Sequence, residues 1–159
     1  MTKMTPILTN EMQQMIMSTG LCFAATVNED GTPNLSPKAS LASIDDRHIG
    51  FADIMSPGTV ANVRRHPAME INIVDIFLRR GYRFSGPAEV IDDGPDFDAV
   101  AKSFWEKAGD MYPVNHVVKM RVESARPVKS PIYTYQPELS EPEIRKRYLD
   151  IYTRIATQD

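Results

Sequence analysis

The stretch that decides the fold is residues 21–54, LCFAATVNEDGTPNLSPKASLASIDDRHIGFADI. Two apolar runs of strand length, 21–27 and 48–54, flank a longer segment at 33–44 in which apolar and polar residues mix. The turn signals Asp30-Gly31 and Asp45-Asp46 separate the three segments, and Asp-Gly favours a tight hairpin because glycine adopts positive φ without steric cost. The pattern predicts three consecutive strands joined by hairpins, which is the beginning of an antiparallel sheet.

Outward from this stretch, alternating apolar and polar residues predict three further strands, at 68–77, 82–91 and 115–128. Apolar residues at helical spacing predict four helices, which begin near Thr9, Ser56, Pro95 and Ser140. Antiparallel strands joined in this way favour closure into a barrel, because closure removes the unpaired edges of an open sheet. We therefore expect a single domain over residues 1–159, mainly β, with a six-stranded antiparallel barrel and flanking helices.

The composition argues against several classes of function. With 18 lysines and arginines against 21 aspartates and glutamates, the net charge of −3 is weak, so neither nucleic acid nor a membrane is an expected partner. No apolar stretch approaches the ~20 residues that span a bilayer, and residues 1–10 lack the features of a signal peptide. Cys22 is the single cysteine, which excludes a disulfide within the chain and fits a reducing compartment. We expect a cytoplasmic protein.

The sequence also lacks common motifs of catalysis and nucleotide binding. No G-x-G-x-x-G follows a strand, and neither G-x-x-x-x-G-K-[ST] nor G-x-S-x-G occurs. The histidines at positions 48, 66 and 116 have no metal-like spacing with one another or with Cys22, so we expect no metal site. Cys22 lies in an apolar run without basic neighbours, where a thiol acts as an inert small hydrophobe.

The strongest local signal is the segment Ser36-Pro37-Lys38-Ala39-Ser40. In a strand, Ser36, Lys38 and Ser40 share one face, while Leu35, Ala39 and Leu41 share the other. Two hydroxyls beside an ammonium group suit an anionic ligand rich in oxygen. The same pattern is also typical of a solvated strand face, and this segment alone leaves both interpretations open.

A second signal begins where the third strand ends. Ser56-Pro57-Gly58-Thr59 opens a helix, and the unpaired N–H groups of a helix N-terminus attract anions. An ordinary capped helix would carry the same residues, so this signal is also open by itself. The hairpin at Asp45-Asp46 places Lys38 near the same sheet edge, where it would supply the cation that a phosphate requires.

At these residues the sequence resembles the FMN-binding split-barrel family named for pyridoxamine 5'-phosphate oxidase. The resemblance covers roughly residues 8–131 and rests on three segments in order: FAATVNEDGTPNLSPKAS, DDRHIGFADIMSPGTVANVRRHPAMEINIVD and GYRFSGPAEV. It implies a split β-barrel that forms a homodimer and holds FMN at the subunit interface. Many family members place a lysine or arginine soon after the loop serine, whereas this chain has Pro57-Gly58-Thr59, so the phosphate would depend on Lys38, backbone amides and hydroxyls.

The resemblance also implies which residues bind the cofactor, and it names no catalytic residue. The assigned residues are Ser36, Lys38 and Ser40 on the strand that lines the flavin; Phe51, Ala52 and Asp53 at the strand end beside its ring; Ser56, Thr59 and Asn62 at the loop and helix start that hold the phosphate and ribityl chain; and Tyr82 and Arg83 on a strand that approaches from the other subunit.

The leading hypothesis is an FMN-dependent oxidoreductase that acts on a small molecule. The flavin would supply the redox chemistry, and Asp53 and Tyr82 are the polar residues expected nearest its ring. A non-enzymatic flavin-binding protein, for storage or redox sensing, is the alternative from another class. A related barrel that binds deazaflavin F420 or haem is a third, and haem is disfavoured because no histidine falls at a convincing axial position. The resemblance also implies that the oxidase itself ends in an arginine-rich, proline-terminated motif that helps to bind the substrate phosphate. This chain ends in Arg154-Ile155-Ala156-Thr157-Gln158-Asp159, so pyridoxamine phosphate is not the expected substrate.

Overall fold

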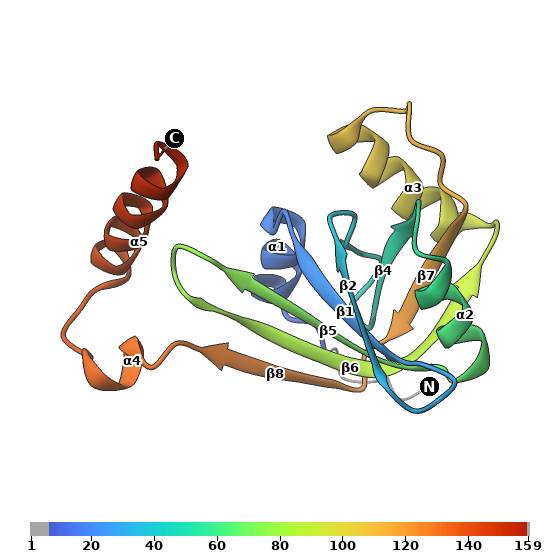
Figure 1. Ribbon diagram of the computed structural model, residues 1–159, viewed down its shortest axis with the longest axis horizontal. Coiled ribbons are helices and arrows are strands. Elements are labelled where there is room, and N and C mark those ends of the chain that lie inside the picture. Colours follow the sequence, from blue (N-terminus) through green and yellow to red (C-terminus); the bar gives the residue numbers. More distant parts are fainter. Residues whose placement is uncertain (1–6, 159) are drawn as a thin grey trace.

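The short apolar runs and their turns fold into one curled antiparallel sheet with helices around it, in a computed structural model that describes residues 7–158 (Figure 1). The strands are β1 Cys22–Val27, β2 Pro33–Lys38, β3 Ala42–Ser43, β4 His48–Asp53, β5 Ala68–Asp75, β6 Arg80–Ile91, β7 His116–Arg121 and β8 Ser124–Lys129. The helices are α1 Asn10–Ser18, α2 Pro57–Arg65, α3 Pro95–Ala108, α4 Ile132–Tyr135 and α5 Glu141–Ala156. The predicted class, mainly β and antiparallel with flanking helices, is confirmed.

Several local predictions are confirmed by the geometry of turns and caps. Thr9 caps α1 and accepts a hydrogen bond from the Met12 amide at 3.3 Å. Gly31 has φ of 83° in the β1–β2 hairpin, a conformation that suits glycine. Ser140 and Glu143 form the expected capping box of α5. The short helix α4 was not predicted. No helix in the described part of the chain is both long enough and apolar enough to cross a bilayer.

The sheet curls because its two end strands are consecutive in the chain. The strand order is β2-β1-β5-β6-β7-β4-β3, with β8 paired to β6. The link at residues 39–41 therefore joins one edge of the sheet to the other. The Ser40 hydroxyl donates to the carbonyl of Ala52 on β4 at 3.0 Å and holds the two edges together. This closure brings β2 next to β4, although the two strands do not pair.

The expected strand count of six is wrong, first because the predicted strand 33–44 is broken. Its first half, β2, pairs with β1, and its second half, β3, pairs with β4. At the break, Ser40 and Leu41 are both buried, at 5% and 4% exposure. Residues 39–41 belong to no strand, so the regular alternation of side chains stops after Lys38 and resumes only at Ala42. The alternation predicted for Ser40 and Leu41 therefore does not apply, because neither residue lies in a strand.

The second break divides the predicted strand 115–128 into β7 and β8. Both halves pair with the long strand β6, but in registers that differ by one residue, as in a β-bulge at Val122-Glu123. There the Val122 amide donates to the Arg47 carbonyl and the Glu123 amide donates to the Ser85 carbonyl. Gly86 lies against this bulge, where an added Cβ would fall 1.9 Å from the Arg121 carbonyl oxygen. The described residues thus form an eight-stranded sheet.

The core lies inside the curled sheet. Fully buried residues such as Phe51, Ile71 and Phe84 fill it, and Ile16 of α1 packs against it. A smaller apolar cluster lies under α3. The helix α5 stands to one side, beyond the β5–β6 hairpin (Figure 1). It is attached there through the buried Ile144 and through contacts at the tip of that hairpin.

Candidate functional site

Lys38 is a buried lysine at the end of β2. Only 8% of its surface is exposed, and its Nζ donates to the Ser36 hydroxyl at 2.7 Å. The Nζ also lies 5.3 Å from the centroid of the Phe51 ring on β4, which is within the range of a cation–π contact. The curl of the sheet therefore brings the predicted residues Ser36, Lys38 and Phe51 together.

The surroundings of Lys38 disfavour its charge. Burial lowers the pKa of the Lys38 ammonium group, and the neighbouring Asp53 carboxylate offsets part of this effect. Cys22 lies opposite Lys38 in the β1–β2 register. Burial raises the pKa of the Cys22 thiol to about 12, against a smaller opposing effect of Lys38. A thiol with this pKa stays protonated at neutral pH, which agrees with the inert role expected for Cys22.

Asp53 shapes the loop between β4 and α2. It is buried, with 4% exposure, and its Oδ1 accepts hydrogen bonds from both the amide and the hydroxyl of Ser56. Ser56 is the N-cap residue of α2, as predicted, but its side chain makes no capping bond to the helix. The expectation of a serine side-chain cap is therefore wrong: the hydroxyl donates to Asp53, and its oxygen accepts from no amide of the helix.

The first turn of α2 has backbone N–H groups without a side-chain cap. Pro57 has no N–H group, and in the described chain no side chain caps the amides that follow it, those of Gly58 and Thr59. These donors belong to the end of the helix that carries a partial positive charge. Together with Lys38, they are the groups of this region that suit an anion.

Thr59 and Asn62 hold α2 against β1 and β2. The Asn34 side-chain amide donates to the hydroxyls of Thr26 and Thr59, at 3.0 and 3.3 Å. Asn62 in turn donates to Thr26 at 3.1 Å, and Arg65 donates to the Asn62 side-chain carbonyl at 2.8 Å. Sequence reasoning missed Thr26, Asn34 and Arg65. Asn34 could have been found, because it precedes Ser36 by two residues and so lies on the same strand face.

The remaining predicted residues fall into two groups. Ser40 and Ala52 follow Lys38 and Phe51 in the chain but offer no free polar group. The Ser40 hydroxyl donates to the Ala52 carbonyl, and the Ala52 side chain packs into the apolar cluster under α3. Tyr82 and Arg83 do not join the cluster. Tyr82 stacks on Phe84 at the inner face, and Arg83 forms an ion pair with Glu70 at 3.2 Å, separated from β2 by β1 and β5.

An open cleft of about 580 Å³ is lined by the β4–α2 loop, including Asp53 and Ser56, but not by Lys38. One wall is the face of α2 that carries Val60 and Arg64, and the other is the beginning of β7 with His116. The His116 Nδ1 is hydrogen-bonded to a carboxylate oxygen of Asp92. No sequence motif pointed to Arg64, Asp92 and His116, because only the fold brings these three residues together.

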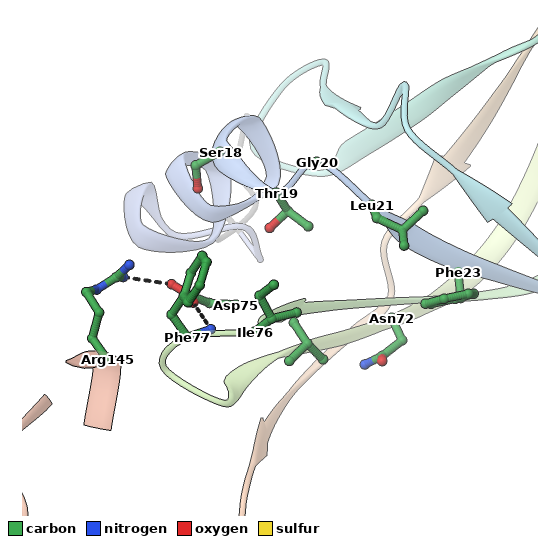
Figure 2. Close-up of a pocket in the computed structure, with 11 residues that line it drawn as sticks. Ser18, Thr19, Gly20, Leu21, Phe23, Asn72, Asp75, Ile76, Phe77 and Arg145 are labelled. Atoms are coloured by element: carbon green, nitrogen blue, oxygen red, sulfur yellow. Dashed lines mark hydrogen bonds and ion pairs between the residues drawn. The ribbon is translucent and has the colours of Figure 1, made fainter. Parts of the chain in front are cut away.

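A second hollow, of about 550 Å³, lies on the outer face of β1 and β5 (Figure 2). Figure 2 shows Leu21, Phe23 and Ile76 along it, and Arg145 of α5 bonded to Asp75 at its end. Since Phe23 follows Cys22, its side chain points to the face of the sheet opposite Lys38. We call this hollow the outer groove. In the part of the chain that the structure describes, no group of three or more histidine, cysteine or acidic residues could hold a metal ion.

Comparison with known proteins identifies the family. The family model described as pyridoxamine 5'-phosphate oxidase matches residues 8–129. The chain therefore belongs to the pyridoxamine 5'-phosphate oxidase-like split-barrel family, and the resemblance seen in the sequence is confirmed. No curated protein matches the chain.

Solved structures agree with this assignment. HupZ of Group A Streptococcus is 32% identical, with a TM-score of 0.68, over 77% of this chain and 94% of its own. An FMN-binding protein from Syntrophomonas wolfei is 16% identical, with a TM-score of 0.65, over 76% of this chain and 86% of its own. An F420 reductase is 17% identical, with a TM-score of 0.59, over 74% of this chain and 98% of its own. The last two similarities show the fold alone.

Proposed function

We propose that the protein binds FMN and acts as an FMN-dependent oxidoreductase on a small molecule. The phosphate would lie between Lys38 and the first turn of α2, within reach of the Ser36 hydroxyl. The observation that carries this proposal is the buried ammonium group of Lys38 at the end of β2, a strand that also contacts α2 through the hydrogen bond from Asn34 to Thr59. The family and the FMN-binding neighbour support the choice of cofactor.

The residues present fit a phosphate group. An ammonium group has three hydrogen-bond donors, and among the described residues only the Ser36 hydroxyl accepts from Lys38. A buried charge with unused donors is unfavourable unless an anion compensates it. Asp53 gives only partial compensation, because the effect of burial on the Lys38 pKa exceeds that of Asp53 and no ion pair joins the two among the described residues. A bound phosphate would accept from Lys38 and from the amides of Gly58 and Thr59.

When bound, the flavin would supply the redox chemistry, and the protein would hold and surround it. Lys38 and Ser36 would bind its anionic end. Asp53 would keep the β4–α2 loop in place through Ser56, and Asn34 would keep α2 against β2 through Thr59. The buried Phe51 would exclude water from the inner side of the site.

Two tests separate this proposal from its alternatives. The visible spectrum of the purified protein, with mass spectrometry of the released cofactor, distinguishes FMN from F420 and from haem. F420 is tested because one structural neighbour is an F420 reductase. Steady oxidation of reduced nicotinamide with an electron acceptor indicates an enzyme. Oxidation that stops at one equivalent indicates a flavin-binding protein for storage or redox sensing. A colourless protein that binds no FMN in titration would refute the proposal.

We also propose that the protein is a homodimer with the cofactor at the subunit interface. Large apolar side chains are exposed on the outer face of β1 and β2, with Leu21, Phe23 and Leu35 at 51%, 41% and 64% exposure. Such a patch is typical of an interaction surface, and the family resemblance favours a second copy as its partner. Light scattering at micromolar concentration tests this, and a monomer would contradict it. The buried free Cys22 is compatible with a cytoplasmic location.

A further inference from the structure

The cleft between α2 and β7 has one apolar wall and one polar end. The side of α2 that faces it carries Pro57, Val60, Ala61 and Arg64, at helical spacing. Asn115 fixes the opposite wall, since its side-chain amide donates to the Ile54 carbonyl at 2.8 Å and its backbone amide donates to the Asp53 carbonyl at 2.9 Å. The cleft is therefore framed by α2, by β7 and by a loop that Asn115 holds where it leaves β4.

His116 is oriented by its neighbour. A carboxylate can only accept hydrogen bonds, so the Nδ1 bonded to Asp92 carries the proton of the neutral ring. This leaves Nε2 as an acceptor, and in the described part of the chain no group donates to it. The His116 side chain is 29% exposed and lines the cleft. A ligand in the cleft can therefore donate a hydrogen bond to Nε2.

Arg64 supplies a cation at the same end. Its Nη2 lies 3.9 Å from the Asp92 carboxylate, which is too long for a hydrogen bond, and 54% of the side chain is exposed. Among the described residues the guanidinium group makes no hydrogen bond, so its donors remain for another acceptor. Its planar fork matches the geometry of a carboxylate.

We propose that this cleft binds a small carboxylate with an apolar body and a hydroxyl or amine group. Arg64 binds the carboxylate, Nε2 of His116 accepts from the hydroxyl or amine, and the apolar wall of α2 contacts the body. As the site of the oxidoreductase substrate, it rests on the proposed function. The cleft adjoins the proposed cofactor site through the β4–α2 loop, since Asp53 and Ser56 line it while Lys38 does not. As a ligand site, it depends only on the residues that line it.

Three aromatic probes test the assignment, with dissociation constants taken from amide chemical-shift titrations of the purified protein. Mandelate carries the carboxylate, the hydroxyl and the ring; mandelamide lacks the charge, and phenylacetate lacks the hydroxyl. We expect mandelate to bind about threefold or more tightly than mandelamide, as for a partly exposed ion pair. We expect it to bind about fivefold more tightly than phenylacetate, as for one hydrogen bond.

Two variants assign these preferences to residues. Arg64→Gln should remove the preference over mandelamide, and His116→Ala should remove the preference over phenylacetate. His48→Ala is the matched control, because His48 also bonds an aspartate, Asp45, but does not line the cleft, and both preferences should persist. Equal binding of the three probes by the unaltered protein, or preferences that survive both cleft variants, would overturn the proposal.

The failure of this site can be distinguished from the failure of the flavin proposal. FMN titration of the unaltered protein tests the Lys38 site and does not depend on His116. If FMN binds while the three probes do not differ, the cleft assignment fails and the proposed function stands. If the probes differ as expected while FMN does not bind, the ligand site stands and its role as the substrate site of a flavoenzyme is lost.

Discussion

Replacing Lys38 by methionine removes the buried ammonium group and keeps an unbranched side chain over the Phe51 ring. The packing contact is largely retained, so the variant tests the charge rather than the core. Burial has already lowered the pKa of this lysine, which means that its charge lacks full compensation before an anion binds. We expect Lys38→Met to fold and to bind FMN more weakly.

The size of the effect follows from the burial of Lys38. A hydrogen bond between charged groups contributes about 1.5–3 kcal/mol, and the 8% exposure of Lys38 leaves little solvent to screen it. At about 1.4 kcal/mol for each factor of ten, the dissociation constant for FMN should rise about 10- to 150-fold. Riboflavin carries the same ring without the phosphate, so its affinity should be the same in both proteins.

The assay is a titration of flavin fluorescence with each protein, with FMN and riboflavin measured in parallel. Lys129→Met is the matched control, because it removes the same charge from an exposed position at the end of β8. Its FMN affinity should equal that of the unaltered protein. An unchanged FMN affinity in Lys38→Met, or an equal loss for FMN and riboflavin, would refute the placement of the phosphate beside Lys38.

Three further predictions concern stability, reactivity and assembly. Gly86→Ala should lower the free energy of unfolding, measured in urea, by more than about 2 kcal/mol, because the added Cβ would meet the Arg121 carbonyl. Gly20 has open space around it, so Gly20→Ala should change this free energy by less than about 1 kcal/mol. Equal effects of the two substitutions would contradict the bulge. The Cys22 thiol should react with a thiol reagent at pH 8 only after unfolding. Burial raises its pKa from 9.0 to about 12, so between these pH values the unfolded chain binds fewer protons than the folded chain. Cys22 should therefore lower the stability from pH 9 to 12 by up to about 1.4 kcal/mol per pH unit, and Cys22→Ala should show a smaller fall than the unaltered protein, since Tyr82 and Tyr133, whose pKa values are also raised, still contribute. Phe23→Asp should convert the proposed dimer to a monomer in light scattering without loss of the far-ultraviolet dichroism, and a variant that stays dimeric would place the interface elsewhere.

The residues of the candidate site that the sequence predicted correctly are those whose positions follow from strand periodicity. Ser36 and Lys38 were placed on one face because the period of a strand is fixed by backbone geometry, which the sequence displays directly. The same period includes Asn34, which was overlooked. The link from Asn34 to Thr59 could not be read in this way, because it joins residues that are 25 positions apart in the chain.

The predictions of one continuous strand at 33–44 and of a side-chain cap by Ser56 were wrong because the observed structure depends on residues distant in the fold or outside the local pattern. The segment 33–44 continues its apolar and polar mixture through Ser40 and Leu41, and nothing local marks the point where the chain leaves β1 and joins β4. Ser56 has the residue type and position of a helix cap, but its hydroxyl donates to Asp53 and makes no bond to the helix amides. In both cases a local preference was outweighed by a partner that only the folded chain supplies.

By itself, the sequence determined the antiparallel class, most strand and helix positions, the caps of α1 and α5 and the family. These depend on side-chain periodicity, turn residues and segment order, which act within a few residues of each other. The tertiary structure alone decided that the sheet curls through Ser40, that Lys38 is buried against Phe51, and that Arg64, Asp92 and His116 meet at one cleft. The physical reason is that burial and charge pairing depend on strands and helices that are distant in sequence, so they are fixed only when the sheet closes.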